Sequence, residues 1–281
     1  MPKGWTWDET LFQGSAPYYE QGRLPYPAAL APTLARVLDL DGRGRLLDVG
    51  CGPGTVALRV AHLFEEVVGL DPDADMLVEA ERRAAELGIT DARWVCALAE
   101  ELPAGLGTFR VATFAQSFHW MDRDRVAAVV RDMLEPDGVF VQVSTGSTGG
   151  LSSNQDGLPY PSPPDAAIAG LVQRYLGPMR RAGQGVLAYG TPGDEAGVLR
   201  RAGGFSEAEI VPLGGGDILV RTADDLVAAT FSNSGSAPHL FGERLGEFEA
   251  ELRAVLAEAS PAGLFAIRTG ETELRVWRVA R

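Results

Sequence analysis

The sequence predicts an α/β fold built on a doubly wound, mostly parallel sheet. Its 281 residues, with a hydrophobic content of 46%, are enough to bury a sizeable core. Short apolar runs typical of buried strands alternate with runs of helical periodicity through the first half of the chain. One stretch, LLDVGCGPGT at 46–55, joins such a strand to a helix through a glycine-rich turn. This alternation predicts parallel strands side by side with helices on both faces.

The unit around this turn covers residues 46–71. An apolar strand at 46–49 runs into the turn, and a helix-compatible run follows at 56–64. A second apolar strand then ends at the carboxylate of Asp71. This order of strand, turn, helix, strand and acid is that of a βαβ nucleotide-binding unit.

The spacing of the glycines indicates which ligand the turn accepts. Gly50, Gly52 and Gly54 are closer together than the glycines of a G-x-G-x-x-G turn, in which a helix N-terminus faces a pyrophosphate. Asp48 would repel a pyrophosphate but attract an ammonium group, and Asp71 is placed to accept hydrogen bonds from ribose hydroxyls. S-adenosylmethionine has a ribose, a cationic amine and no phosphate. A nicotinamide-binding unit, or a turn whose glycines serve packing alone, is the alternative.

The elements that follow continue the alternation. We expect a helix over 73–88, strands over 92–96 and 109–115, a helix over 123–134 and a strand over 139–143. Each strand is a short apolar run, and each helix carries apolar residues at spacings of three and four. The strands of this half are therefore expected to be parallel neighbours in one sheet.

Residues 144–165 form a long loop rich in Ser, Gly and Pro. The loop leaves the carboxyl end of the strand at 139–143, and ligands bind at that end of open α/β sheets. Long loops in such places are often functional. An amphipathic helix is expected over 166–182, broken or kinked at Gly177-Pro178, and a further strand over 207–213.

Residues 214–262 have the pattern of an insertion before the last strands. They contain a second amphipathic helix over 240–259, whose apolar face either packs in the core or lines an apolar substrate pocket. Strands over 264–269 and 273–279, on either side of a turn at Gly270, predict an antiparallel C-terminal hairpin.

The motifs, in this order, resemble those of the class I S-adenosylmethionine-dependent methyltransferases. DVGCGPGT followed by VVGLDPDADML is similar to the first two motifs of that family. The likeness continues with WVCALAEELP at 94–103, FRVATFAQSFHWMD at 109–122 and MLEPDGVFVQVS at 133–144, and covers residues 10–145. It implies a Rossmann-like methyltransferase fold with seven strands and S-adenosylmethionine as cofactor. The QSFHW run is most similar to the small-molecule branch that contains trans-aconitate and malonyl-carrier-protein methyltransferases.

The resemblance also implies that the whole chain forms one domain, residues 1–281. Its expected segments are an N-terminal cover (1–27), a cofactor-binding core (28–143) that opens with a helix at 28–40, helical lid insertions on the substrate side (144–200 and 214–262), and C-terminal strands (263–281).

The cofactor contacts that the resemblance implies lie in the cover, in the glycine turn and at the ends of the following strands. They are Tyr18, Arg23, Asp48, Gly50, Cys51, Gly52, Gly54, Asp71, Pro72, Met76, Ala99, Glu100 and Gln116. The glycines would underlie the methionine part, Asp71 would bind the ribose and Met76 would lie against the adenine. Leu98 stands where the family often has an Asp that accepts from the adenine amino group, which leaves the Ala99 N–H to reach the ring. For the two cover residues, packing against the sheet edge is an equal alternative.

Methyl transfer from a sulfonium needs alignment above all, and a base only where the acceptor must lose a proton. His119, just after the strand at 109–115, is the first candidate for a catalytic base, and His239 in the second insertion is another. The alternatives are packing behind the site for His119 and a cap at a helix start for His239. No metal-ligand spacing is present, so no metal site is predicted, and Cys51 and Cys96 are too few for a metal cluster or a disulfide framework.

Charge and composition narrow the class of partner. The net charge of −13 disfavours a nucleic acid, although arginine pairs such as Arg180-Arg181 could form a local patch. The sequence has no apolar run that could span a membrane and no N-terminal run resembling a signal peptide, so we expect a cytoplasmic protein without a membrane partner. The Ala-, Gly- and Arg-rich composition is typical of a GC-rich bacterial genome.

We therefore expect an S-adenosylmethionine-dependent methyltransferase that acts on an O or N atom of a small molecule, for example a secondary metabolite or a carboxylic acid. S-adenosylhomocysteine would be its product, and no oligomeric state is predicted. One alternative is a protein that binds S-adenosylmethionine without methyl transfer, as a partner subunit or a rearrangement catalyst. Another is a nucleic-acid or protein methyltransferase, against which the acidic composition argues.

Overall fold

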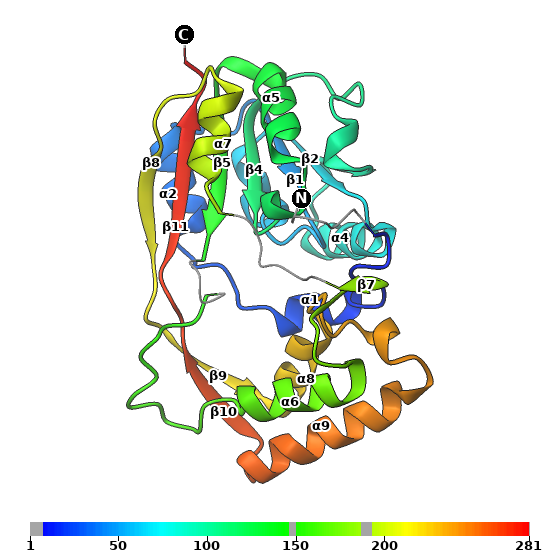
Figure 1. Ribbon diagram of the computed structural model, residues 1–281. Helices are drawn as coiled ribbons and strands as arrows, with labels where there is room; N and C mark the ends of the chain where they lie inside the picture. Colours follow the sequence, from blue (N-terminus) through cyan, green and yellow to red (C-terminus); the bar gives the residue numbers. More distant parts are fainter. Residues whose placement is uncertain (1–7, 146–149, 187–192, 281) are drawn as a thin grey trace.

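A seven-stranded sheet forms the centre of the computed structural model, which describes residues 8–145, 150–186 and 193–280. The strand order is β3-β2-β1-β4-β5-β11-β8 (Figure 1). The strands are β1 (Arg45–Val49), β2 (Glu66–Asp71), β3 (Ala92–Cys96), β4 (Phe109–Ala115), β5 (Leu134–Ser144), β8 (Glu209–Gly214) and β11 (Thr272–Arg278). The first five are parallel neighbours, and β11 runs antiparallel to both β5 and β8. The predicted doubly wound, mostly parallel sheet is confirmed.

Helices cover both faces of this sheet because successive strand residues point to opposite faces. The covering helices are α2 (Leu30–Leu38), α3 (Ala57–Val60), α4 (Ala74–Leu87), α5 (Arg123–Met133) and α7 (Glu195–Ala202). On β5, Phe140 points into the core shared with α5 and α7, whereas its neighbour Val141 belongs to the core beneath α2 and α3. None of the helices in the described ranges combines the length and apolar character needed to cross a membrane.

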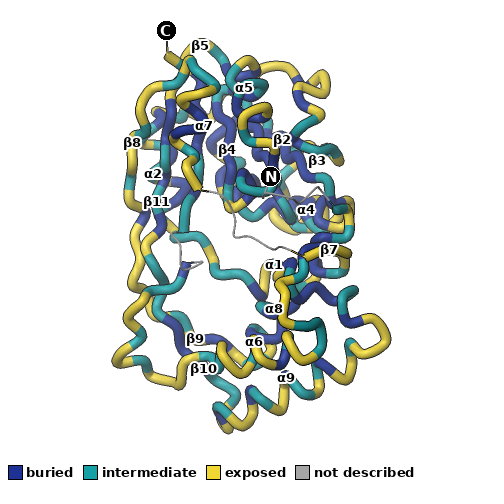
Figure 2. Tube along the Cα trace, viewed as in Figure 1, coloured by how far each residue is buried: buried dark blue, intermediate teal, exposed yellow. Residues whose placement is uncertain are grey.

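A second body, which we call the lid, lies beyond the carboxyl ends of the parallel strands (Figure 1). It consists of α6 (Asp165–Leu176), β9 (Ile218–Thr222), α8 (Ala223–Phe231), α9 (Leu245–Ala259) and β10 (Leu264–Arg268). The lid has an apolar core of its own around the fully buried Phe231, Phe248 and Phe265, and Figure 2 shows buried segments in both bodies. Residues 1–7 of the expected cover, 146–149 and 187–192 of the expected lid, and residue 281 lie outside the described residues.

The two C-terminal strands do not pair with each other, so the predicted hairpin about Gly270 needs correction. β10 pairs with β9 in the lid, while β11 enters the main sheet between β5 and β8, each antiparallel to its neighbours. The segments before β9 and after β10 thus cross side by side between the two bodies, and these crossings are bonded to each other, since the Gly216 N–H donates to the Thr269 carbonyl at 2.9 Å. A Cβ at Gly215 would lie 2.5 Å from the Gly270 carbonyl oxygen, so only glycine permits this close approach.

Two helices of the lid are shorter than predicted, for local reasons. α6 does not reach the expected bound of 182 but ends at the predicted break, where Gly177 adopts φ 86° and Pro178 follows. The chain then forms a small hairpin of β6 (Arg181–Ala182) and β7 (Gly185–Val186). α9 begins later than expected because Gly242, at φ 53° and ψ −132°, interrupts the helical run.

Candidate active site

Two adjoining cavities lie where β1, β2 and β4 end and the lid begins. The small cavity has a volume of about 80 Å³ and the large cavity a volume of about 650 Å³. Residues of the N-terminal segment, the glycine turn and the end of β4 line both cavities: Phe12, Tyr19, Gly50, Gly52, Ala115, Gln116 and Trp120. The carboxyl ends of the parallel strands therefore meet a common hollow, which is where open α/β sheets bind ligands.

Two glycines of the turn, Gly50 and Gly52, line the cavities, whereas the third, Gly54, packs inside the protein. Gly50 has φ 69°, and a Cβ there would lie 2.5 Å from the Cβ of Ser117. Gly52 has φ 53° with no atom within 4 Å of its Cβ position, so its backbone faces open space in the cavity. Gly54, expected to be a cofactor contact, instead packs inward, because a Cβ there would lie 2.9 Å from the indole of Trp94. Gly54 therefore belongs to the packing of the turn rather than to the cavity wall.

Asp71 ends β2 at the wall of the small cavity. Its carboxylate accepts hydrogen bonds from the backbone N–H groups of Gly52 at 2.8 Å and Asp73 at 3.0 Å, which hold it in one orientation. Burial raises the pKa of Asp71 to about 6 against the opposing effect of these bonds. Four more of the predicted contacts line this cavity: Pro72, Met76, Ala99 and Glu100. Leu98 lines it as well.

Asp48 lies at the floor of the large cavity and is 1% exposed. It accepts hydrogen bonds from Thr113 Oγ1 at 2.7 Å and from the Ala57 N–H at 3.2 Å. Burial raises the pKa of this carboxyl to about 6 in spite of both bonds. Cys51 lines the same cavity, and burial raises the pKa of its thiol well above the ordinary value, so the thiol is uncharged. A cation in this cavity would find its buried counter-charge in Asp48.

Gln116 follows β4 and lines both cavities. Its φ of 57° is uncommon for a residue other than glycine, and strained backbone of this kind clusters at functional sites. Its side-chain Nε2 donates to Thr145 Oγ1 at 3.1 Å. Gln116 thus joins the end of β4 to the start of the loop after β5.

The N-terminal cover contains a short helix, α1 (Ala16–Gly22), where a proline-bounded segment was expected. It carries Tyr18 into the lid core, where the ring lies 5.1 Å from that of Phe231. Tyr19 lines both cavities instead, because neighbouring residues of a helix point about 100° apart. The tyrosine that lines the cavities is therefore Tyr19 and not the predicted Tyr18. Arg23 lines the large cavity, as predicted.

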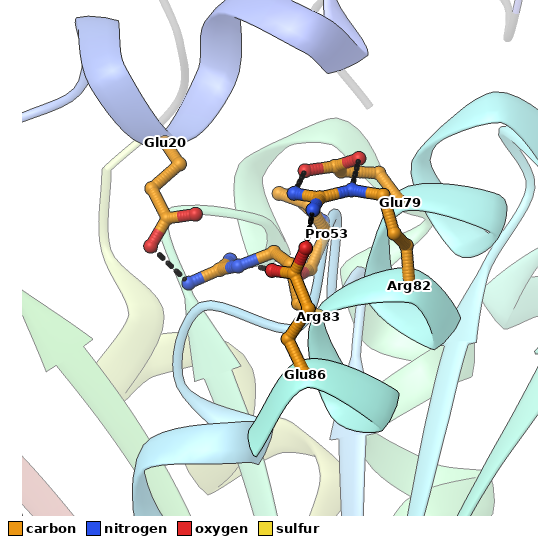
Figure 3. Close-up of polar contacts among 6 residues, drawn as sticks. All are labelled: Glu20, Pro53, Glu79, Arg82, Arg83 and Glu86. Carbon is orange, nitrogen blue, oxygen red and sulfur yellow. Dashed lines mark hydrogen bonds and ion pairs between the residues drawn. The ribbon is translucent and has the colours of Figure 1, made fainter. Parts of the chain in front are cut away.

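An arginine of α4 ties the cover to the glycine turn (Figure 3). Arg83 donates from Nη1 to the carbonyl oxygen of Pro53 at 2.8 Å and pairs through Nη2 with Glu20 of α1 at 2.7 Å. Its neighbour Arg82 pairs with acids of α4 itself. Because one guanidinium holds both partners, α1 and the turn are positioned relative to each other.

The two predicted catalytic histidines lie in different surroundings. His119 lines the large cavity, where burial and the nearby charges of Arg180 and Arg123 lower its pKa to about 4. The ring is therefore uncharged at neutral pH. His239 joins the lid to the N-terminal segment, with Nδ1 at 3.0 Å from the Gln13 carbonyl oxygen, and it is not among the residues that line the two cavities. Its position gives no support to the predicted catalytic role.

The predicted contacts omitted several residues of the large cavity, which come from segments far apart in the chain. They are Phe12, Tyr19, Tyr26, Trp120, Thr145, Arg180, Asn233 and Ser234. Trp120 lies in the QSFHW run just after β4, but no local motif marks most of the others, because the docking of cover and lid brings them to the end of β4. Within the part of the chain that the structure describes, no group of three or more His, Cys, Asp or Glu side chains could hold a metal ion.

Comparison with known proteins matches residues 46–138 to the family model of a methyltransferase domain. The chain is 30% identical over 204 residues to the 27-O-demethylrifamycin SV methyltransferase of Amycolatopsis mediterranei, which is 70% of this chain and 67% of that protein. It is 30% identical over 125 residues to a probable S-adenosylmethionine-dependent methyltransferase of Saccharomyces cerevisiae, CRG1, covering 44% and 43% of the two chains.

Among solved structures, the YcgJ protein of Bacillus subtilis has the same fold. The TM-score is 0.51 at 17% sequence identity, over 90% of this chain and 98% of that chain. By contrast, the chain spans about half the length of the first curated relatives that it matches.

Proposed function

We propose that this chain, which belongs to the class I S-adenosylmethionine-dependent methyltransferases, transfers a methyl group to an oxygen or nitrogen atom of a small molecule. A secondary metabolite or a carboxylic acid is the kind of acceptor that we have in view. One observation carries the proposal. The slot beside Asp71 adjoins, past the glycine turn, a second and larger cavity beneath the lid. A cofactor laid across the turn therefore leaves space for an acceptor beside it.

The residues present fit S-adenosylmethionine. The slot between Met76 and Leu98 suits a flat adenine, and the fixed carboxylate of Asp71 suits the two ribose hydroxyls. Asp48 offers the ammonium group a buried carboxylate. Arg23 suits the cofactor carboxylate, because its Nε is buried and has no hydrogen-bond partner among the described residues.

Bound S-adenosylmethionine supplies a methyl group on a positively charged sulfur, which is already activated for displacement. The contribution of the chain is therefore to bind and align the reactants. The backbone of Gly52 admits a ligand at close range, while Tyr19 and Trp120 line the junction of the two cavities. Aromatic rings at that junction favour a positive charge over their faces. The lid and the cover keep water from the acceptor.

His119 is the side chain of the large cavity that we propose as general base or hydrogen-bond acceptor. With a pKa lowered to about 4, it is uncharged and able to accept a proton, but it is a weak base at neutral pH. The site therefore suits acceptors that are already ionised or lose a proton readily. We propose no catalytic role for His239.

A small acceptor suits this site better than a nucleic acid. The large cavity lies between the sheet and the lid, so it suits a ligand that can be enclosed there. The net charge of −13 also opposes the approach of a polyanion.

Two measurements test the proposed function. Calorimetric titration with S-adenosylmethionine and S-adenosylhomocysteine should give dissociation constants of roughly micromolar size for both. Incubation with methyl-labelled S-adenosylmethionine and a panel of small carboxylic acids, phenols and amines should yield a labelled product. Binding without a labelled product across the panel would favour the alternative, a protein that binds the cofactor without methyl transfer. An absence of binding at about 1 mM would contradict the proposal itself.

A further inference from the structure

Three basic side chains of the large cavity come from segments far apart in the chain, and Arg59 of α3 also lines it. Arg23 follows α1, His119 follows β4, and Arg180 lies between α6 and β6. The charges act on one another: burial and Arg23 lower the pKa of Arg180, and burial and Arg180 lower the pKa of His119. Two carboxylates, those of Asp48 and Asp217, line the same cavity. Grouping the basic side chains nonetheless costs free energy where no carboxylate is in direct contact with them.

The two arginines have no acidic partner in the described part of the chain. Neither Arg23 nor Arg180 lies within 4.0 Å of an Asp or Glu oxygen there. Arg23 donates from Nη2 to the Ser232 carbonyl at 2.6 Å and lies 4.9 Å from the Tyr19 ring, which fixes its position without neutralising its charge.

Arg221, a buried arginine away from the cavity, differs from the two cavity arginines because it has an acidic partner. Arg221, at the end of β9, donates to the Gln21 carbonyl at 2.6 Å and lies 3.7 Å from the Asp225 carboxylate. Its charge is therefore paired within the protein. Arg23 is by contrast half-buried and Arg180 is exposed to solvent, and neither has such a partner, so both guanidinium groups remain available to an anion that enters the large cavity.

Bound S-adenosylmethionine brings one carboxylate, and Arg23 is the arginine that we assign to it. The charge of Arg180 then remains unpaired on the His119 side of the cavity, which is the acceptor side. A guanidinium in this position can form two parallel hydrogen bonds to a planar carboxylate. Ser234 and Asn233 line the same cavity and offer further polar contacts.

We propose that Arg180 binds a carboxylate of the acceptor and so selects acidic small molecules as substrates. This inference rests on the proposed function. It adds to that function a specificity residue in the lid, which touches the substrate away from the cofactor. The aromatic wall formed by Trp120 and Tyr26 would contact the apolar body of the same molecule.

The test compares acids with their uncharged amides on protein saturated with S-adenosylhomocysteine. Benzoate, cinnamate and octanoate, each beside the matching amide, are titrated by ligand-observed NMR. At least one acid should bind at least about tenfold more tightly than its amide. Arg180→Gln should weaken the binding of that acid at least about tenfold. Arg180→Lys keeps the positive charge but loses the two parallel N–H donors of the guanidinium, and should weaken it less.

The matched control is Arg174→Gln in α6. Arg174 is 62% exposed and pairs with Glu251 at 2.7 Å, so its loss should change acid binding by less than about twofold. Affinity for S-adenosylmethionine should be unchanged in all three variants, which also shows that each is folded.

Three results of the acid titrations would overturn the inference. They are equal binding of acids and amides, an unchanged acid affinity in Arg180→Gln, and no acid binding below about 10 mM. A loss of S-adenosylmethionine affinity in Arg180→Gln with acid binding intact would also overturn it, because Arg180 would then hold the cofactor. In each case, cofactor binding by the unmodified chain is a separate readout, so the proposed function stands or falls independently.

Discussion

The small and the large cavity share a wall but treat charge in opposite ways. In the small cavity, the carboxylate of Asp71 is held by two backbone N–H groups and has one fixed orientation. In the large cavity, Arg23 and Arg180 lack an acidic partner among the described residues. The chain itself holds the carboxylate of the small cavity, whereas the two arginines of the large cavity, which Asp48 and Asp217 also line, are left for a ligand to pair.

This difference reflects the parts of the chain that form each cavity. Main-chain groups of one βαβ unit position the carboxylate of the small cavity, which suits a cofactor whose structure does not vary. Side chains from the cover, the end of β4 and the lid form the wall of the large cavity, which suits an acceptor that differs among relatives of one fold. Substitutions in the two cavities should therefore differ in the property that they change and in the size of the change.

The largest effect is expected at the fixed carboxylate. Asp71→Ala removes the ribose partner and the acceptor of the Gly52 N–H together, so affinity for S-adenosylmethionine should fall at least about 100-fold by calorimetry. Asp75→Ala changes an exposed acid in the first turn of α4 and should bind normally. A loss below about threefold at Asp71 would mean that the small cavity is not the adenosine site.

The next largest effect is expected on stability, where alanine substitutions at Gly54 and Gly52 of the same turn should differ. Gly54→Ala combines φ 72° with a Cβ 2.9 Å from Trp94, and should lower the free energy of unfolding by about 2 kcal/mol in denaturant titrations. Gly52→Ala meets no atom within 4 Å and should cost about 1 kcal/mol from its backbone conformation alone. The reverse order would show that Gly54 does not pack as described.

A smaller effect is expected from pH. The pKa values of Asp48 and Asp71, both raised by burial to about 6, mean that these groups are ionised at pH 7 and mostly protonated at pH 5. Because the ammonium and ribose groups need carboxylates, affinity for S-adenosylmethionine should fall about tenfold from pH 7 to pH 5 for each of the two carboxylates that binding requires in ionised form. His119, with its pKa lowered to about 4, stays uncharged over this range. Titrations at four pH values measure the change, and Asp71→Asn should flatten it.

The same two carboxyls affect the unliganded protein with the opposite sign. Their pKa values are higher in the folded than in the unfolded chain, so the folded state binds protons more tightly. Their contribution to stability should therefore rise as pH falls from 6 towards 4. Thermal unfolding of the unliganded Asp48→Asn variant should lack part of this rise, and an equal rise in variant and parent would contradict the assignment.

The smallest effect is expected at the contact between α1 and α4. Glu20→Gln removes the partly exposed ion pair with Arg83, and should weaken cofactor binding about two- to threefold in the same calorimetric titration. Glu86→Gln, whose partner is Arg82, is the matched control and should have no effect. Equal behaviour of the two variants would show that the cover does not help to position the glycine turn.

The small cavity could be predicted from the sequence because its parts lie in one local unit. The positions of Gly50, Gly52 and Asp71 follow from the order of strand, turn and strand, and the structure brings all three to one wall. The parallel sheet could be predicted in the same way, from runs of apolar residues at regular intervals.

The large cavity could not be predicted, because its residues meet only through tertiary contacts. Whether Tyr18 or Tyr19 faces the ligand depends on the rotation of a short helix that no motif marks. Arg180 follows an amphipathic helix and has the pattern of a solvated helix end, yet it faces a cavity. The hairpin at Gly270 failed for a related reason, since the partner of β10 lies over forty residues earlier in β9.

The paired crossings at Gly215 and Gly270 are one connection between the lid and the sheet, besides those from β5 to α6 and from β7 to α7. Two hydrogen-bonded strands resist shear and separation, but they bend readily across their flat face where glycines replace side chains. α1 is attached to the lid as well, because Ser15 Oγ donates to the Phe231 carbonyl at 2.7 Å. The Glu20–Arg83 pair therefore joins an element that is bonded to the lid to a helix that covers the sheet.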